Sequence, residues 1–357
     1  MTLLGERQHS QADQDLHWYT SNVVTPEFPQ IIEALQICCN LLIFNSPQEP
    51  DEANRIERGP AIKLPFSTNK LEALKGIIVR DGQHVTKMSL AIRDSHFKTL
   101  HRLTLKEPIL LAQIVTAKDS VEKAIAILRD LAKGDDCSTI GHQKLIESFS
   151  SLLHEIQIAK SSLQLPTDPS LVFPVNVTPL LAFEPELPPT VAIDLYISQA
   201  EVCVDLKSLH RVTERPWGDI TPTGLSYIDK IRDEMKLPSS HTTPGAISVA
   251  ATPVRPASPL NVSEIEDRLN QLTQSSDRSH EGSRIFSNVI SHLLLKPKLE
   301  PIDYVTKCIT YNNMVVMINK KIEVSSPDPV LVSAFTKLDS VEYLISSFLV
   351  NLECLLN

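Results

Sequence analysis

Histidines and paired carboxylates are the residues of this chain whose side chains could bind a metal ion or transfer a proton. His96 and His101 lie five positions apart on a predicted β-strand, a spacing that places them on opposite faces of a sheet. His142 and His154 lie 12 positions apart on a predicted helix, too far to share one ion. These spacings favour surface histidines, so we predict no metal ligands.

Two pairs of neighbouring acids, Asp51-Glu52 and Asp135-Asp136, have the residue type needed for general acid–base catalysis. Both lie in polar turns, where no apolar pocket is predicted to raise a carboxyl pKa. The dispersed glycines form no GxGxxG or Walker-type phosphate loop, and the chain contains neither GxSxG nor HExxH. The sequence therefore predicts no catalytic residue, no cofactor-binding residue and no cofactor. An enzyme with an unrecognised site is the alternative.

Four hydroxyl–proline dipeptides could accept phosphate from a proline-directed kinase. They lie in residues 213–283, a stretch rich in Pro, Ser and Thr and poor in large apolar residues. This composition predicts a mostly disordered insertion, with marginal short helices at 226–235 and 263–272. An ordinary low-complexity linker explains the dipeptides equally well. The dipeptides are Thr221-Pro222, Thr243-Pro244, Thr252-Pro253 and Ser258-Pro259.

The composition of the 357-residue chain narrows the class of protein further. Its formal net charge is −9, which argues against a nucleic-acid partner, because a phosphate backbone attracts a positive field. The six cysteines form no CxxC pair and lie mostly in apolar segments, which is typical of reduced, buried thiols. No signal peptide is visible, and the apolar runs are shorter than the roughly 20 residues of a membrane helix. We therefore expect a soluble cytoplasmic protein. The cysteines are Cys38, Cys39, Cys137, Cys203, Cys308 and Cys354.

Four stretches repeat apolar residues at alternating spacings of 3 and 4, which is typical of helices with one apolar seam. Gly134 ends the second helix, since glycine readily adopts the left-handed conformation of a C-cap. No seam extends over more than four heptads, and each is bounded by proline or glycine residues, so packing within the chain is favoured over a zipper with another protein. The seams run from Phe28 to Leu42, Ile114 to Leu131, Leu145 to Leu163 and Leu331 to Leu355.

A period of two predicts antiparallel strands elsewhere in the chain. Two hairpins are expected, because Asp81-Gly82 and Asn312-Asn313 tolerate the positive φ of a tight turn. Residues 285–295 are apolar and ambiguous between helix and strand. The predicted strands are 76–80, 87–93, 97–105, 191–197, 202–206, 304–311 and 314–324.

These elements predict an α+β fold in one intertwined unit, because the chain crosses several times between its helices and its strands. We expect an antiparallel four-helix bundle built from the separated segments 16–45, 108–165 and 328–357. The segments of the adjoining antiparallel β domain would be 61–106, 188–212 and 302–325.

Several apolar segments occur in an order and spacing that resemble a known family. They are Leu16–Trp18, Phe28–Gln36, Leu74–Val79, Leu111–Ile114, Ala159–Leu163, Phe183–Pro188, Val191–Ile197 and Cys203–Leu206. The chain is similar to the Rogdi family, which includes the smaller subunit of the fungal RAVE complex. It differs from animal members by a longer insertion at 211–282 and by additional polar residues at the N-terminus. The short seams do not support the leucine zipper of the family's older label.

The resemblance implies a protein without catalytic activity. Members have a helical-bundle domain and a β domain, and act in a complex that promotes reassembly of the vacuolar proton-pumping ATPase. We therefore expect a scaffold subunit of a RAVE-like complex, recruited peripherally from the cytoplasm to vacuolar or endosomal membranes without direct insertion. The implied partners are a large rabconnectin-like WD-repeat scaffold, an adaptor shared with SCF ubiquitin ligases, and peripheral-sector subunits of the ATPase. Another cytosolic adaptor or a vesicle-tethering subunit is the alternative.

Overall fold

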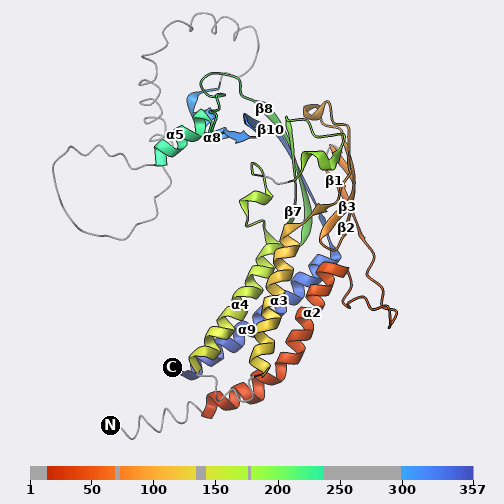
Figure 1. Ribbon diagram of the computed structural model, residues 1–357, viewed down its shortest axis with the longest axis vertical. Helices are drawn as coiled ribbons and strands as arrows, with labels where there is room; N and C mark the ends of the chain where they lie inside the picture. Colours follow the sequence, from red (N-terminus) through yellow and green to blue (C-terminus); the bar gives the residue numbers. More distant parts are fainter. Residues whose placement is uncertain (1–13, 69–72, 134–141, 176–177, 237–298, 357) are drawn as a thin grey trace, which may run out of the picture. The chain divides into compact units, whose positions relative to one another are not determined.

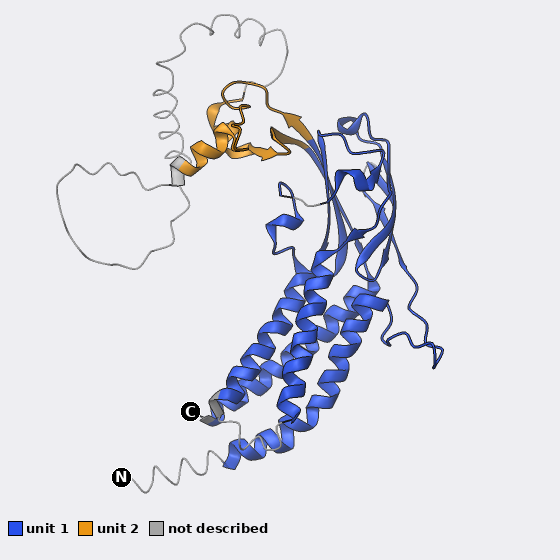
Figure 2. Cartoon of the chain, viewed as in Figure 1, with its two compact units in different colours: residues 1–208, 320–357 blue, residues 209–319 orange. Residues whose placement is uncertain are grey.

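The computed structural model describes residues 14–68, 73–133, 142–175, 178–236 and 299–356. The chain divides into two compact units, residues 1–208 with 320–357 and residues 209–319 (Figure 2). Long helices and antiparallel sheets form separate parts of the fold (Figure 1), which confirms the predicted α+β class.

Four long helices of the first unit pack against one another. α2 (Phe28–Phe44) contacts α3 (Ala112–Lys133) and α9 (Pro329–Leu356), and α4 (His142–Gln164) contacts the same two helices. Figure 1 shows α2 and α4 running toward the strands, and α3 and α9 running away from them. Each helix is therefore antiparallel to the two that it contacts.

The predicted apolar seams form the contacts between these helices. Val121 on α3 and Ile156 on α4 are fully buried. The ring of Phe149 on α4 lies between those of Phe28 and Phe348, with centroid distances of 6.1 and 6.5 Å. Burial of such a face supplies most of the stability of a helix in a protein. The prediction that the seams pack within the chain is confirmed.

The larger sheet has six strands, and its pairs are antiparallel. Gly82 forms the turn between the second and third strands at φ +57°, which confirms the first predicted hairpin. β5 (Ile109–Leu110) pairs with β3. The other strands lie in the order β1 (Ile62–Ser67), β2 (Leu74–Asp81), β3 (His84–Ile92), β4 (Arg102–Leu105), β6 (Phe183–Glu184).

The second sheet has four strands, two of which contribute residues to both units. Asn312 and Asn313 both have positive φ in its β9–β10 turn, which confirms the second predicted hairpin. All residues of β7 except Ser198 are buried, so this edge strand is covered on both faces. The strand order is β7 (Val191–Ser198), β8 (Glu201–Arg211), β10 (Met314–Pro327), β9 (Cys308–Tyr311).

The second unit has a small core around Trp217. The indole stacks on the ring of Tyr304 at 4.9 Å between centroids and meets the ring of Tyr227 edge-on. Tyr227 begins α5 (Tyr227–Lys236), and Tyr304 lies in α8 (Pro301–Lys307), which contacts α5. The three aromatic rings thus hold the two short helices together.

Part of the predicted disordered insertion, residues 213–236, is ordered. Arg232 on α5 donates to the carbonyl oxygens of Val305 and Cys308 at 2.5–2.8 Å. The short helix considered possible at 226–235 is present as α5, and partners distant in sequence hold this part of a segment whose composition is linker-like. Other predictions lie outside the described residues, namely those for Asp135-Asp136, Cys137, 237–283 and 285–295.

The predicted strand 304–311 is half helix. α8 occupies its first half, and β9 begins only at Cys308. Pro301 lies in the first turn of α8, and the carboxylate of Asp303 accepts the N–H of Glu300 at 3.1 Å. Both are signals of a helix start, and they outweigh the period-two pattern that predicted a strand.

The predicted strand 97–105 is also shorter than expected. The carboxylate of Asp94 caps a 3-10 turn at Ser95–Phe97, and β4 starts only at Arg102. Alternation alone did not reveal this turn, because Phe97 is buried in the turn much as it would be in a strand.

Candidate functional site

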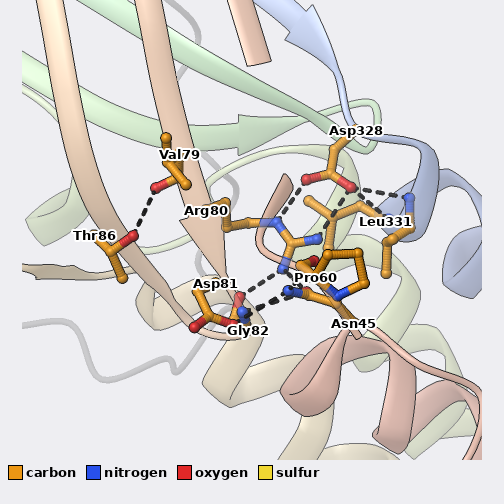
Figure 3. Close-up of polar contacts among 10 residues, drawn as sticks. Asn45, Pro60, Val79, Arg80, Asp81, Gly82, Thr86, Asp328 and Leu331 are labelled. Carbon is orange, nitrogen blue, oxygen red and sulfur yellow. Dashed lines mark hydrogen bonds and ion pairs between the residues drawn. The ribbon is translucent and has the colours of Figure 1, made fainter. Parts of the chain in front are cut away.

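A fully buried ion pair lies where helices of the first unit meet the larger sheet (Figure 3). The Nε of Arg80 on β2 is 2.6 Å from Oδ2 of Asp328, and its Nη2 is 3.0 Å from Oδ1. The same Oδ1 accepts the N–H groups of Val330 and Leu331 at 2.9 and 3.1 Å. One carboxylate therefore pairs with β2 and caps the first turn of α9.

Asn45 connects the end of α2 to this ion pair (Figure 3). It ends α2 in the left-handed conformation, with φ 54°. Its Oδ1 accepts hydrogen bonds from Nη1 of Arg80 at 2.9 Å and from the N–H of Gly82 at 3.3 Å. Nη1 of Arg80 also donates to the carbonyl of Gly82 at 2.6 Å. The junction thus ties α2, α9 and the β2–β3 hairpin together, and its role is structural.

A second buried cluster of charges links β7 and β8. Nζ of Lys207 is 2.5 Å from Oδ2 of Asp194 and 2.6 Å from Oδ2 of Asp205, and no side chain of the three is more than 7% exposed. The two acids face each other in the strand register, and the Oδ1 of each lacks a hydrogen-bond partner among the described residues. Burial raises the pKa of Asp194, although the ammonium of Lys207 opposes the shift.

This cluster supplies its own positive charge. Lys207 takes the place that a metal ion would need between the two carboxylates. The N–H of Phe173 donates to Oδ2 of Asp194 at 3.0 Å, and the Phe173 ring centroid lies 5.4 Å from Nζ of Lys207. Within the described ranges, no group of three His, Cys, Asp or Glu residues could hold a metal ion.

The histidines considered in the sequence lie apart from one another. Nδ1 of His96 is 2.7 Å from the carboxylate of Asp94 in a turn, and His101 precedes β4. His154 is exposed on α4, whose first residue is His142. The structure does not bring the side chains of His96, His101 and His154 together as ligands of one ion, and the side chain of His142 lies outside the described part of the chain.

The other residues considered in the sequence are held in turns. Hydrogen bonds from Asn54 lower the pKa of Asp51, the opposite of what a general acid requires. The hydroxyl of Thr221 donates to the carbonyl of Leu225 at 2.8 Å inside a turn. The other three dipeptides considered above, Thr243-Pro244, Thr252-Pro253 and Ser258-Pro259, lie outside the described residues.

Four of the thiols are buried and free, as predicted, whereas Cys354 is exposed. Burial raises the pKa of Cys38, Cys39 and Cys203 to about 12 and that of Cys308 to about 11. Because the thiolate is the nucleophile, these buried cysteines are unreactive near neutral pH.

Two open grooves mark the surface of the first unit. One, of ≈ 530 Å³, is lined by residues of α2 and α3 that include Cys39, whose pKa is raised. The other, of ≈ 560 Å³, includes Lys321, which pairs with Glu323 at 2.8 Å. In the first groove the carboxylate of Glu122 raises the pKa of Cys39 further, which opposes formation of the thiolate nucleophile.

The helical stretch Gln14–Phe44 is long and apolar enough to cross a membrane, judged by length and composition only. Its uninterrupted apolar runs are short, as expected from the sequence, because polar residues such as Glu33 and Asn40 interrupt them. The structure places Leu35 and Leu42 of this stretch in the core of the first unit. A core helix satisfies the same criterion of length and composition, so the criterion alone does not predict a membrane span.

The charged residues of the Arg80–Asp328 junction and of the Lys207 cluster were not predicted from the sequence. The available signal was a charge at an inward position of a strand. Arg80 follows Leu74 and Ile78 at a period of two, and Asp194 interrupts the apolar strand β7. Such positions favour a buried, paired charge, but the partner of each lies elsewhere in the sequence.

Exposed apolar side chains mark the surfaces that are free for contact. On α9, Tyr343 is 77% exposed and Val350 is 54% exposed, and their spacing of seven residues places them on one side of the helix. On the larger sheet, Ile77 is 52% exposed. Single exposed apolar residues are common, so a contact surface is identified by neighbouring residues on the same face.

This chain is similar to one protein family and to two fungal proteins that share a name. The model of the family described as "Rogdi leucine zipper containing protein" matches residues 15–353. The chain is 23% identical over 355 residues to "Regulator of V-ATPase in vacuolar membrane protein 2" of Saccharomyces cerevisiae, covering 96% of this chain and 91% of the relative. It is 24% identical over 220 residues to the protein of the same name from Schizosaccharomyces pombe, covering 54% of this chain and 71% of that relative.

Proposed function

The chain belongs to the Rogdi leucine zipper family, and from this membership we propose that it regulates the vacuolar-type proton ATPase without being an enzyme. The observation that carries the proposal is the similarity over nearly the whole chain to a yeast protein named as a regulator of that ATPase in the vacuolar membrane. The unreactive buried thiols and the charge cluster at Lys207, whose two carboxylates pair with Lys207 and Lys321, agree with a role outside catalysis.

We further propose that the protein is a scaffold subunit of a RAVE-like complex that promotes assembly of the ATPase from its peripheral and membrane sectors. Its partners would be a WD-repeat scaffold, an SCF-type adaptor and peripheral-sector subunits of the ATPase. The protein would then act from the cytoplasm at vacuolar or endosomal membranes.

In this proposal α2, α3, α4 and α9 are an antiparallel four-helix bundle, formed by segments 16–45, 108–165 and 328–357. The bundle gives the subunit a rigid body, because its seams are buried and its end is fixed by Arg80 and Asp328. The outer side of α9, with Tyr343 and Val350, would supply the apolar contact with the WD-repeat scaffold. Tyrosine is enriched at the centres of protein interfaces.

Purification of the tagged protein from its own host tests the proposal. We expect a WD-repeat protein and peripheral ATPase subunits to be recovered with it, and loss of the protein to impair acidification of the vacuole. Recovery of neither class of partner would contradict the proposal, and recovery of tethering factors instead would favour the vesicle-tethering alternative.

A double variant, Tyr343→Ser with Val350→Ser, tests the proposed contact. It should reduce recovery of the WD-repeat scaffold and leave the unfolding midpoint of the protein nearly unchanged, since both side chains are exposed. Leu110→Ser with Leu181→Ser is a matched control, because these residues are 50% and 67% exposed elsewhere in the first unit. Equal recovery with both variants would rule out the side of α9 as the contact.

A further inference from the structure

The outward face of the larger sheet carries a set of exposed and half-exposed residues that we call the β-face. Their buried neighbours on β1–β4, such as Leu64 and Ile78, point into the core, and alternation along each strand points the β-face the other way. The β-face consists of Lys63, Pro65, Ser67, Lys75, Ile77, Val79, Lys87, Ser89, Ala91, Arg102 and Thr104.

The strand register places four cations around the edge of the β-face. Val79 pairs with Lys63 on one side and Lys87 on the other, which makes one row. A parallel row contains Lys75 and, beyond β3, Arg102. With strands about 4.8 Å apart and a rise of about 3.3 Å per residue, the Cα atoms of the cations are about 10 Å apart within a row and about 13 Å between rows.

The charge of the β-face is opposite to that of the chain, whose formal net charge is −9. None of the β-face residues is acidic, and the exposed acid on this side of the sheet beyond them is Glu184 on β6, which pairs in register with Thr104 at the edge opposite β1. The nearest acid on the outward side of β2, Asp81 at the hairpin, is paired with Arg58 at 2.8 Å. Lys63 and Lys87 form no ion pair with any residue that the structure describes. Their charges are therefore available to a partner of negative charge.

The centre of the β-face is apolar. Ile77, 52% exposed, lies in the middle row between Pro65 on β1 and Ser89 on β3. β1 is the edge of the sheet, and Pro65 there lacks the N–H that an added strand would need. A partner therefore meets the face of this sheet and does not extend its edge.

The composition of the β-face favours a membrane surface over a protein. Centres of protein interfaces are enriched in aromatic residues and depleted in Lys and Ser, whereas the β-face has three lysines, two serines and no aromatic residue. Lysines near an anionic bilayer are attracted to it without a shaped pocket, and an exposed isoleucine can enter the headgroup region.

We propose that the β-face binds the surface of an anionic lipid bilayer, with Lys63, Lys75, Lys87 and Arg102 near the headgroups and Ile77 at the headgroup–acyl boundary. The sheet lies on the bilayer and does not span it. The charges and register of the sheet carry this inference, which does not depend on the proposed role in regulating the ATPase.

Flotation of the full-length protein with vesicles tests the inference. Binding to vesicles of phosphatidylcholine mixed with phosphatidylserine should exceed binding to phosphatidylcholine alone, and added salt should weaken it. Lys63→Gln with Lys87→Gln should lower the partition coefficient about 30-fold. Ile77→Ser should lower it less and leave the preference for phosphatidylserine in place.

A matched control makes the same change of charge on α3. Lys123→Gln with Lys133→Gln alters residues that are 64% and 77% exposed, and binding should be retained. Equal binding to both kinds of vesicle, no binding to either, or equal losses in the two double variants would each overturn the inference. Loss of vesicle binding by Lys63→Gln with Lys87→Gln supports the inference if the unfolding midpoint of this double variant equals that of the unaltered protein. If the midpoint of the double variant is lowered, the Ile77→Ser variant decides, and unchanged vesicle binding by Ile77→Ser would then overturn the inference. If the protein binds polyglutamate through Lys63 and Lys87 but does not bind vesicles, the inference is overturned and the β-face is assigned to an acidic protein.

Discussion

The ion pair of Arg80 and Asp328 provides a direct test of how the first unit is held together. Asp328→Asn removes the negative charge but keeps an oxygen that can accept the N–H groups capping α9. The guanidinium of Arg80 then stays buried without its counter-charge, which costs about 3–5 kcal/mol. The free energy of unfolding should fall by that amount. Asp339→Asn is the matched control, because Asp339 pairs with Lys160 at the surface and is 60% exposed; it should cost less than about 1 kcal/mol.

A double-mutant cycle with Arg80→Met separates the effect of charge from that of shape. Arg80→Met alone leaves the carboxylate of Asp328 buried and unpaired, so it should also destabilise the fold. The double variant buries no charge, and its cost should be smaller than the sum of the two single costs by about 2–3 kcal/mol. Urea unfolding of the full chain, followed by circular dichroism, gives the three free energies. If the costs add to within about 0.5 kcal/mol, the two charges are not coupled and our account of the junction is refuted.

Three other predictions concern single residues. Gln113 on α3 is buried, and its side-chain amide forms hydrogen bonds with both the N–H and the carbonyl of Ile197 on the edge strand β7, at 2.7 and 2.8 Å. Gln113→Leu leaves both groups of Ile197 unpaired and should lower the free energy of unfolding in urea by about 2–5 kcal/mol. An unchanged free energy of unfolding would contradict the role of this amide. Gly82→Ala should cost about 1–3 kcal/mol in the same assay, because its φ is +57° and an added Cβ would lie 2.3 Å from the carbonyl oxygen of Ile43. Burial raises the pKa of Asp194 above its ordinary value, so between the unfolded-state and folded-state pKa values the folded state binds more protons than the unfolded state, and the protein loses stability as pH rises through this window. Asp194→Asn should therefore gain stability relative to the unaltered protein as pH rises above the ordinary pKa of an aspartate, and a difference that stays constant with rising pH would refute the assignment.

The parts of the fold that are determined locally could be predicted from the sequence. The four seams were identified because a spacing of 3 and 4 places side chains such as Val121 and Ile156 on one face of a helix, whatever that face contacts. The two hairpins were identified because Gly82 and the Asn312-Asn313 pair permit positive φ at the turn. These signals depend on neighbouring residues only.

The buried polar contacts could not be predicted, because their partners are far apart in the sequence. Arg80 and Asp328 are separated by 248 positions, and Gln113 is separated from Ile197 by 84. A single sequence shows a charge within an apolar strand, but not the residue that neutralises it. For the same reason, the composition of residues 213–236 predicted a linker, although Trp217 and Arg232 find partners near Tyr304 and Cys308.

The position of α9 at the end of the chain has a consequence for the order in which the protein is made. α9 covers the seams of both α2 and α4, and Asp328 immediately before it supplies the only carboxylate that the described structure places against Arg80. During synthesis the ribosome therefore completes two sheets and three of the four long helices before the residues that close the first unit have been added. A chain that stops before Asp328 should expose apolar surface on α2 and α4 and leave an unneutralised guanidinium in the interior. Premature stop codons before Asp328 should consequently yield aggregation-prone, rapidly degraded products, because the product lacks the 28 residues of α9.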